Sequence, residues 1–560
     1  MILKLKNIYF TAVNKINNKL SYHPKEREYD TYVTDVDANR GIGFSEELQR
    51  IEFLQFRYTD LLGKFLAKYV MSDYDELYGF LKKGIGLDGS SVKGFSEINE
   101  SDLLLVPDRH TLRLNPFFTN FTLGSVIANV HKGFGFGRLS RDPRFVSENM
   151  EEYLAESNLT CQIGPEVECF VFDTISFRDN EENIIDTDNQ SNVKYGDTLS
   201  PVANLQSSAS NIIVSEEQYG VGKYPINRKG GYDAPPFQDS LVEFRFEVAS
   251  LLKKYYGIKV TNLNHEVAST GQIEINFMHS KLTDAADNVQ IYKDVVRNVA
   301  KRHNKIANFM PKPLFDETDP SGVKADNGSG MHVSISLWDK SSSSSSASSG
   351  NASSSKPLSS QNIFFDEEDA YANISQSGRY FIGGVLDHSR SLVAITSPTV
   401  NSYYRMVPGF EAPVYVAWSR GNRSAIVRIP INDKLSRDSK RIEFRAPDPS
   451  CNPYLAFSAI VAAGLDGMRK KIDPGDPIDE NIYKMSDSRR SDLGIKSVPG
   501  SLEESIAALK SDHLYLTNTC LNDECLETYT VLKEDEISRL REYEGKGESR
   551  LQQFYMYYDV

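Results

Sequence analysis

The sequence predicts an α+β protein in which a small N-terminal domain precedes a larger one. Helix-like and strand-like runs alternate from Phe44 onward, and a strand rich in apolar and acidic residues follows Gly164-Pro165. The chain has 560 residues, 40% hydrophobic and 25% charged, which is ordinary globular composition with enough length for two cores. A segment at residues 141–143 looks like a hinge, so we expect the two domains to meet there.

Composition also indicates an extension and two insertions. Residues 1–43 are polar with clustered charges, and we expect an N-terminal extension there. The small domain then spans residues 44–142 and the second domain residues 143–560. Polar stretches at about 173–230 and 341–362, the latter serine-rich, are expected insertions into the second domain.

The small domain is expected to open with a helix and a hairpin. The helix covers Glu46–Glu52, and the hairpin strands cover Phe53–Tyr58 and Lys64–Val70. Leu62-Gly63 supplies the turn between the strands. A second helix is expected over Tyr74–Lys83.

A glycine-rich segment follows this helix, Gly84-Ile-Gly86-Leu-Asp88-Gly89-Ser90-Ser91. By spacing alone it matches the dinucleotide-binding pattern G-x-G-x-x-G. Because it follows a helix and opens none, we do not expect a dinucleotide there. Asp-Gly is common in any turn, so Asp88 on its own carries no function.

After a helix over Val146–Ser157, the strand Ile163–Phe172 organises the second domain. Alternate side chains of a strand share a face, so Glu166 and Glu168 point the same way as the phenylalanines at 170 and 172. Two carboxylates half buried among aromatic rings repel each other unless a cation or a shared proton lies between them. The alternative is an edge strand with a wet acidic end.

Later strands present further polar faces. Clean alternation after Gly271 places Glu274 on the polar face of its strand, shortly after Glu266, although that face could simply meet solvent. A helix over Asp287–His303 follows. The next strand carries His332 on one face with two serines, and a single histidine on a strand is more often structural than a ligand.

The last block of the core is rich in arginine. Two prolines stiffen the loop that carries Glu411, and Glu443 shares a strand face with Arg445. Asn452-Pro453 is expected to cap a buried helix over Ala456–Leu465, and the chain from residue 502 onward is expected to be helical.

Composition excludes several classes of protein. The formal net charge of −14 argues against non-specific binding to nucleic acid or to an anionic membrane, and we find no apolar run long enough for a transmembrane helix. Lys6-Asn7 interrupts the apolar start of the chain, so a secretion signal is not expected. The five cysteines lack metal-type spacing and are expected to be free thiols in a reducing compartment.

Together these residues predict a phosphoryl-transfer site built on metal ions and arginines. Glutamate with little histidine suits Mg²⁺ or Mn²⁺ better than zinc, and fixed arginines stabilise a transferring phosphoryl group. No P-loop pattern is present, so phosphate is held in another way. The candidate ligands are Glu166, Glu168, Glu266, Glu274, Glu443 and His332, and the candidate arginines are Arg405, Arg423, Arg428 and Arg445.

A series of motifs in fixed order resembles the glutamine synthetase family, type I of the prokaryotic class, over roughly residues 45 to 510. The motifs are Asp88-Gly-Ser-Ser91, Gly164-Pro-Glu-Val-Glu168, His265-Glu-Val-Ala268, Gly271-Gln-Ile-Glu274, Phe309-Met-Pro-Lys-Pro313, Asn327-Gly-Ser-Gly-Met-His332, Pro398-Thr-Val-Asn-Ser402, Asn422-Arg-Ser424, Arg428-Ile-Pro430, Arg445-Ala-Pro-Asp448 and Asn452-Pro-Tyr-Leu455. The resemblance implies a β-grasp N-terminal domain and a catalytic domain with an antiparallel sheet and surrounding helices.

The resemblance also implies an activity, the ATP-dependent ligation of ammonia to glutamate through γ-glutamyl phosphate. It implies two or more Mg²⁺ or Mn²⁺ ions, with ATP as co-substrate. It implies one metal ion bound by Glu168, Glu266 and Glu274 and a second bound by Glu166, His332 and Glu443. Glutamate would bind to Asn327, Gly328, Arg405 and Arg445, and the ATP phosphates to Arg423 and Arg428, with the nucleotide near Ser334 and Ser336. Asp88 would bind ammonium, and Glu411 would lie on a flap over the site.

The implied assembly is two stacked hexameric rings in the cytoplasm, in which Asp88 reaches the active site of the neighbouring subunit. No nucleic-acid or membrane partner is implied. The chain departs from the family at two positions: Ser334 and Asn264 stand where further histidines are usual.

Three alternatives stay open. A γ-glutamyl ligase of the same superfamily would use an amine or polyamine in place of ammonia, although Asp88 and Glu411 favour ammonia. A catalytically silent relative with a regulatory role would be expected to lack ligands, yet all six are here. A hydrolase using Glu166 and Glu168 as acid and base would leave the arginines unexplained.

Overall fold

A computed structural model describes most of the two predicted domains. The described residues are 50–71, 74–133, 136–178, 184–186, 212–215, 226, 229–268, 271–315, 326–340, 361–408, 410–431, 436–543 and 549–560. The expected N-terminal extension, the first part of the helix expected over Glu46–Glu52 and most of the two expected insertions lie outside them. The described end of that helix, Arg50–Glu52, is not helical.

The small domain is a six-stranded sheet with strand order β2-β1-β6-β4-β3 and β5 beside β6. Its elements are β1 (Phe53–Thr59), β2 (Phe65–Met71), α4 (Tyr74–Lys83), β3 (Ile85–Asp88), β4 (Asp102–Pro107), β5 (Arg113–Leu114) and β6 (Leu123–His131). Strands β1 and β2 form the predicted hairpin, and β1 pairs in parallel with β6. Leu77 of helix α4 joins the apolar core of this sheet, so the helix covers one of its faces.

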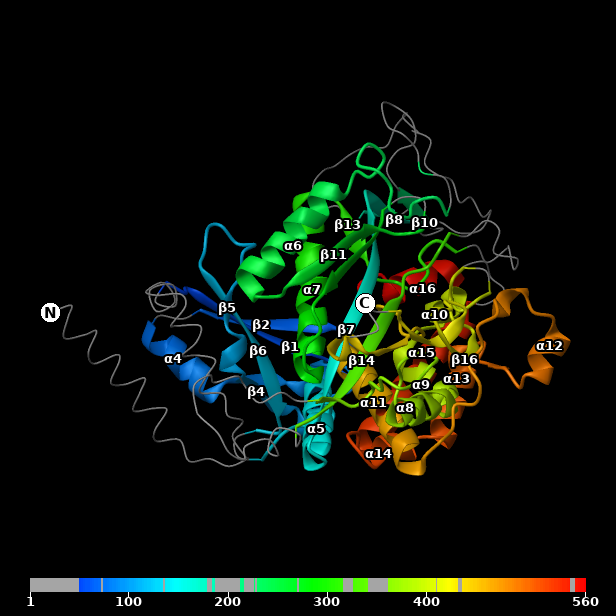
Figure 1. The fold of residues 1–560 in the computed structure, drawn as a ribbon. Coiled ribbons are helices and arrows are strands. Elements are labelled where there is room, and N and C mark those ends of the chain that lie inside the picture. Colours follow the sequence, from blue (N-terminus) through cyan, green and yellow to red (C-terminus); the bar gives the residue numbers. More distant parts are fainter. Residues whose placement is uncertain are drawn as a thin grey trace, which may run out of the picture.

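The second domain is built on a ten-stranded sheet with the order β11-β12-β7-β14-β18-β17-β16-β19, in which β13 also pairs with β7 and β15 with β14. Figure 1 shows its two long strands, β7 and β14, side by side. Its strands are β7 (Leu159–Phe172), β11 (Val260–His265), β12 (Gln272–Phe277), β13 (Ile306–Asn308), β14 (Met331–Asp339), β15 (Gln361–Asn362), β16 (Tyr415–Arg420), β17 (Ala425–Ile429), β18 (Ile442–Phe444) and β19 (Lys496–Ser497). The predicted antiparallel pairing holds except between β16 and β17, which run parallel.

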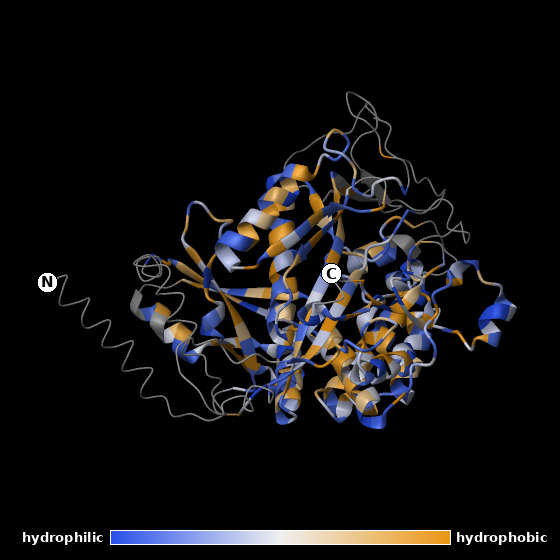
Figure 2. Ribbon diagram, in the orientation of Figure 1, coloured by the Kyte–Doolittle hydropathy of each residue, from blue (hydrophilic) through white to orange (hydrophobic). Residues whose placement is uncertain are grey.

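Helices surround this sheet, as predicted. They are α5 (Pro143–Glu156), α6 (Val242–Tyr256), α7 (Leu282–Arg302), α8 (Gln376–Asp387), α9 (Ser389–Thr396), α10 (Val400–Arg405), α11 (Pro453–Lys470), α12 (Asp487–Asp492), α13 (Leu502–Ser511), α14 (Leu514–Thr517), α15 (Asp523–Arg541) and α16 (Ser549–Tyr557). Figure 2, in the orientation of Figure 1, shows that the ribbon of α11 is mostly coloured as hydrophobic, and its residues belong to the main apolar core. Asn452 caps α11 by accepting a hydrogen bond from the Tyr454 N–H at 3.1 Å. The described part of the first insertion adds a small sheet of β8 (Thr174–Arg178), β9 (Ile184–Asp186) and β10 (Ile212–Ser215).

Strand β7 separates two apolar clusters, as its alternating sequence predicts. Val167, Cys169 and Val171 pack into the main core with α7, whereas Phe170 and Phe172 belong to a second cluster with residues of α16. The two phenylalanine rings stack with their centroids 5.5 Å apart. All five cysteines are free and buried, and burial raises the pKa of each thiol.

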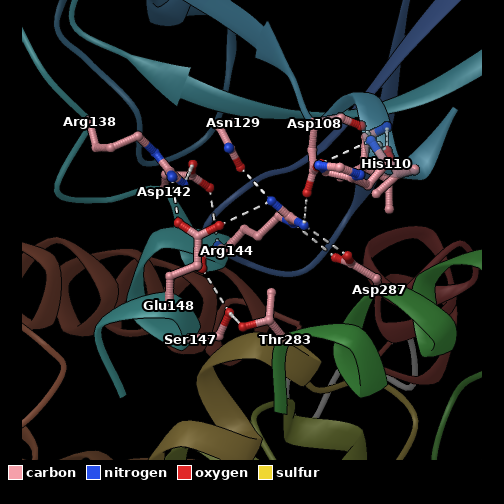
Figure 3. A network of polar contacts seen from close by, with 12 residues as sticks. Asp108, His110, Asn129, Arg138, Asp142, Arg144, Ser147, Glu148, Thr283 and Asp287 are labelled. Atoms are coloured by element: carbon pink, nitrogen blue, oxygen red, sulfur yellow. Dashed lines mark hydrogen bonds and ion pairs between the residues drawn. The ribbon is translucent and has the colours of Figure 1, made fainter. Parts of the chain in front are cut away.

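A buried polar network joins the small domain to helices α5 and α7 at the segment expected to be a hinge (Figure 3). Asp142 caps α5, and Arg144 in its first turn donates hydrogen bonds to Asp287 of α7 at 3.0 Å and to Asp108 at 2.8 Å. Arg144 also donates to Asn129 of β6 at 2.6 Å. The segment is therefore the fixed start of a helix rather than a flexible joint.

A second ionic group lies among helices α8, α9, α11 and α13. The ring of His388 lies between two carboxylates, 3.0 Å from Asp466 and 2.9 Å from Asp512, and stacks on Tyr515. Burial opposes the charged form of the ring, but these hydrogen bonds outweigh it and raise the pKa of His388. Among the described helices, none is both long and apolar enough to cross a membrane.

Candidate active site

The register of three strands brings the predicted acidic residues onto one face of the sheet. Glu168 of β7 lies directly opposite Glu274 of β12, and Glu166 lies opposite His332 of β14. Directly opposed residues on neighbouring strands point to the same side of the sheet. One strand further on, Glu443 of β18 extends the same face. The alternation predicted from sequence therefore becomes a cluster only through long-range strand pairing.

The first cluster consists of Glu166, His332 and Glu443. Each offers one ligand atom, and these atoms all lie within 4.8 Å of one another. Burial lowers the pKa of His332 well below its usual value, so the imidazole is neutral and keeps a lone pair for a cation. Burial raises the pKa of Glu166, although nearby arginines oppose the rise. The spacing and the donor chemistry fit a divalent cation.

The second cluster consists of Glu168, Glu266 and Glu274. Burial and mutual repulsion raise the pKa of Glu168 to about 7, that of Glu274 to about 8 and that of Glu266 to about 10. Three carboxylates that oppose one another's ionisation form an anionic site in need of positive charge. Oxygen donors of this kind suit Mg²⁺ or Mn²⁺, so the donor chemistry of this cluster suits a divalent cation, whereas ligand atoms within 4.8 Å of one another are found in the first cluster.

Amide groups fix the orientation of these carboxylates. Gln272 and the backbone N–H of Gly330 both donate to Glu168 Oε2, at 3.2 and 2.8 Å. Asn264 and Asn276 both donate to Glu274 Oε1, at 3.2 and 2.8 Å, leaving its second oxygen for a ligand. Asn264 is thus a positioning group for Glu274 in this chain.

The arginines of the last block converge on Glu443 and on the backbone behind it. Arg428 and Arg445 donate to the two carboxylate oxygens of Glu443 at 2.6 and 2.8 Å. Arg405 is buried and donates to the carbonyls of Ala446 and Arg445 at 2.8 and 3.3 Å. The hydrogen bonds to Glu443 hold positive charge in place beside the acidic clusters. The Nε atoms of Arg428 and Arg445 are buried and have no hydrogen-bond partner among the described residues.

A cavity of about 230 Å³ collects most of the predicted site. The predicted residues that line it are Glu166, Glu168, Glu266, Glu274, Asn327, Gly328, His332, Arg405, Glu411, Arg423, Arg428, Glu443 and Arg445. Glu411 lies on the loop after α10 with a φ of +60°, a conformation that is uncommon outside glycine and typical of strained functional sites.

Three predicted residues do not line this cavity. Asp88 is exposed at the end of β3, where its carboxylate accepts hydrogen bonds from Ser90 and Ser91 that lower its pKa. Ser334 accepts a hydrogen bond from Arg441 Nε at 3.3 Å, and Ser336 accepts one from the Trp338 indole at 2.9 Å. The two serines lie on the predicted face of β14 but are occupied by these neighbours.

Sequence reasoning missed several lining residues. Arg441 lies two positions before Glu443, so the alternation that predicts a shared face for Glu443 and Arg445 also reaches Arg441. Gln272 likewise shares the face of Glu274. Tyr232 and Phe410 line the cavity from loops, for which no periodic signal exists.

Comparison with known proteins agrees with this geometry. Residues 140–551 match the family model for the glutamine synthetase catalytic domain, and residues 50–133 match that for the glutamine synthetase beta-grasp domain. The glutamine synthetase of Sulfolobus acidocaldarius is 41% identical over 498 residues, which cover 88% of this chain and 93% of that protein. That of Streptomyces coelicolor is 38% identical over 518 residues, 91% of this chain and 97% of its own.

Solved structures share the fold. The cryo-EM structure of Plasmodium falciparum glutamine synthetase has a TM-score of 0.70 at 24% identity and covers 95% of this chain and 100% of its own. The structure described as the GmaS/ADP complex, conformation 1, has a TM-score of 0.66 at 25% identity, and the match covers 93% of this chain and 99% of that one. The chain belongs to the glutamine synthetase family. It is an enzyme of the α+β class, a glutamate–ammonia ligase.

Proposed function

We propose that the cavity on β7 joins ammonia to glutamate by way of γ-glutamyl phosphate, with ATP as co-substrate, and that the enzyme is of type I. The observation that carries this proposal is the strand register, which opposes Glu168 to Glu274 and Glu166 to His332. Arg428 beside these groups supplies the fixed positive charge that a transferring phosphoryl group requires.

Two divalent cations, Mg²⁺ or Mn²⁺, bind in this proposal. Glu166, His332 and Glu443, whose ligand atoms lie close together, hold one, and Glu168, Glu266 and Glu274, which line the same cavity, hold the other. When bound, the cations neutralise charge on the phosphoryl oxygens and orient them. The chain's own contribution is to keep six donors in one cavity with their orientations fixed by neighbouring amides and arginines.

Glutamate binds between Asn327, Gly328, Arg405 and Arg445. A Cβ atom at Gly328 would lie 3.1 Å from Arg405 Cγ and 2.5 Å from the Pro311 carbonyl, so only glycine leaves the space open. The Gly328 carbonyl accepts a hydrogen bond from Gln272 at 3.0 Å, which fixes this backbone. Arg423 and Arg428 meet the ATP phosphates, and Ser334 and Ser336 lie in the nucleotide region.

The reaction proceeds in two displacements. The γ-carboxylate of glutamate attacks the γ-phosphorus of ATP, the bond to the bridging oxygen breaks, and ADP leaves. Asp88 of a neighbouring subunit takes a proton from ammonium, and the resulting ammonia attacks the acyl carbon and displaces phosphate. Glu411 closes the cavity so that water does not take the place of ammonia.

This role for Asp88 requires subunits that share active sites, and we place the enzyme in the cytoplasm as two stacked hexameric rings. The support is that Asp88 is exposed and is not among the lining residues described for the cavity of its own chain. We place the domain boundaries where the sequence suggests them, with residues 44–142 as the β-grasp domain and residues 143–560 as the catalytic domain.

The test is glutamine formation from glutamate, ammonium and ATP, with and without Mg²⁺ or Mn²⁺. We expect activity only with metal, and a raised KM for ammonium with an unchanged KM for glutamate in Asp88→Asn. A preference for methylamine over ammonium would assign the site to another amine, and ATP turnover without any amide product would refute the proposal.

A further inference from the structure

The loop that carries Glu411 includes an aromatic side chain, Phe410, whose ring makes cation–π contacts with two lysines. Phe410 lines the cavity and is 9% exposed. The ammonium nitrogen of Lys312 lies 3.8 Å from the centroid of this ring, and that of Lys229 lies 3.9 Å from it. The lysines come from separate segments, one before α6 and one after β13, so the ring ties the Glu411 loop to two other parts of the domain.

Lys312 is an unusual partner because it is buried. The residue is 1% exposed, and Nζ has no hydrogen-bond partner among the described residues. Burial lowers the pKa of Lys312 to about 7, and Asp326 acts against the lowering. The π face of Phe410 also favours the charged form, and a desolvated cation–π contact is stronger than an exposed one. The Phe410 ring is therefore a direct contact of this ammonium group.

The backbone of Lys312 is fixed, so the ammonium is a firm anchor. Prolines at 311 and 313 flank the residue. Its N–H donates to the Asn401 side-chain oxygen at 2.7 Å, and its carbonyl accepts from the Asn401 amide at 3.1 Å. A side chain anchored in this way restrains whatever packs on it.

Glu411 follows Phe410 directly and depends on such restraint. Its left-handed φ of +60° is unfavourable for a residue with a Cβ and persists only where neighbours impose it. On its other side, the Ala412 carbonyl accepts a hydrogen bond from the Tyr483 hydroxyl at 2.7 Å. In the chain, Glu411 therefore lies between two held residues, Phe410 and Ala412. Its carboxylate is close enough to Glu266 to raise the pKa of that residue.

We propose that Phe410, clamped by Lys312 and Lys229, is the positioning residue that holds Glu411 over the cavity and thereby keeps water from the acyl phosphate. This inference rests on the proposed function. With the clamp intact, ammonia is the nucleophile and each ATP yields one glutamine. With the clamp loosened, water attacks the acyl carbon, and glutamate and phosphate are released without an amide bond.

The experiment measures glutamine formed and phosphate released in the same reaction, for the full-length enzyme with Mg²⁺. Phe410→Leu removes the π face, Lys312→Met removes the cation at similar chain length, and Phe410→Tyr keeps the ring. We expect the first two to lower kcat for glutamine by about tenfold to a hundredfold and to yield less than one glutamine per phosphate. Phe410→Tyr is expected to restore the one-to-one ratio.

Two further variants separate positioning from folding. Phe410→Leu should add no further loss in a Glu411→Ala background, because the ring acts through Glu411. Lys254→Met, which removes a lysine 4.9 Å from the Tyr255 ring outside the cavity, is the matched control and should behave as wild type. Unfolding midpoints and particle size for every variant identify a loss that comes from misfolding.

The outcomes distinguish the inference from the function on which it rests. A ratio of one in folded Phe410→Leu and Lys312→Met, or a full additional loss in the Glu411→Ala background, would overturn the clamp while leaving the ligase assignment in place. A wild-type enzyme that forms no glutamine would overturn the proposed function itself.

Discussion

Replacing Glu274 by glutamine should stabilise the metal-free protein and weaken the metal-bound one. Glu274 is 7% exposed and lies directly across from Glu168. Its pKa is raised from 4.5 to about 8, by burial first and then by the carboxylates of Glu168 and Glu166. Gln is nearly isosteric, and its carbonyl oxygen can still accept the hydrogen bonds that Asn264 and Asn276 donate.

The size of the effect follows from two estimates, of which the first is an upper limit and the second the value we expect. At about 1.4 kcal/mol per pKa unit, the shift corresponds to about 5 kcal/mol of destabilisation at pH 8 as an upper limit. Two carboxylates about 5 Å apart at an effective dielectric constant of about 20 repel by about 3 kcal/mol. We therefore expect Glu274→Gln to raise the free energy of unfolding by about 3 kcal/mol at pH 8 in the presence of a chelator.

The pH dependence has a definite sign. Because the folded-state pKa lies above the unfolded value, the penalty is absent below about pH 4.5 and grows as pH rises towards 8. The advantage of the glutamine variant should therefore be small at pH 5 and large at pH 8. With a divalent cation at about 100 times its Kd, wild type gains about 2.7 kcal/mol and the variant gains much less, so the difference narrows or reverses.

The assay is urea unfolding at pH 5 and pH 8, with EDTA or with Mn²⁺, on wild type, Glu274→Gln and Glu152→Gln. Glu152 is exposed on α5, so its variant controls for the loss of one negative charge. If Glu274→Gln is no more stable than wild type in EDTA at pH 8, the repulsion argument is wrong. If it keeps the full stabilisation by Mn²⁺, Glu274 is not a ligand.

Two further predictions concern groups far from the cavity. Arg144→Met leaves Asp287 buried without its cation and should lower the free energy of unfolding, measured in urea, by about 3–5 kcal/mol. Arg109→Met, at an exposed site, is the control and should change it little. Equal effects of the two substitutions would contradict the network in Figure 3. His388→Gln should destabilise the protein more at pH 6 than at pH 9, because the raised pKa of His388 stabilises the fold below its unfolded value near 6.5 and that stabilisation is lost at higher pH. A pH-independent difference in the unfolding midpoint would show that the ring is not charged in the folded state.

The local sequence pattern predicted the strands that carry the site but not how these strands pair with one another. Alternation along β7 predicted that Glu166 and Glu168 share a face, and the structure confirms it. Alternation along β12 did not decide whether Glu274 faces solvent, because the sequence of that strand does not show that β7 and β11 pair with it on either side. Strand order and register are set by contacts between residues far apart in the sequence, and these decide which polar face is buried.

Other differences have similar causes. The helix expected over Glu46–Glu52 is absent from its described end, Arg50–Glu52, which forms a turn and an irregular segment before β1. The pair of β16 and β17 runs parallel although only residues 421–424 connect the two strands, and local pattern does not reveal that direction. Phe410 had no periodic signal, since its role comes from two lysines that only the folded chain brings to one ring.

We propose above that six side chains, five of them on neighbouring strands and that of Glu266 directly after β11, hold two divalent cations for the ligase reaction. Mn²⁺ binding followed by electron paramagnetic resonance on the purified enzyme tests it most directly, with Glu274→Gln and Glu443→Gln beside wild type. We expect two tight Mn²⁺ ions per chain in wild type, loss of one in each variant, and loss of glutamine formation in both. Wild type that binds no tight Mn²⁺, or variants that still bind two ions and form glutamine at the wild-type rate, would contradict the account.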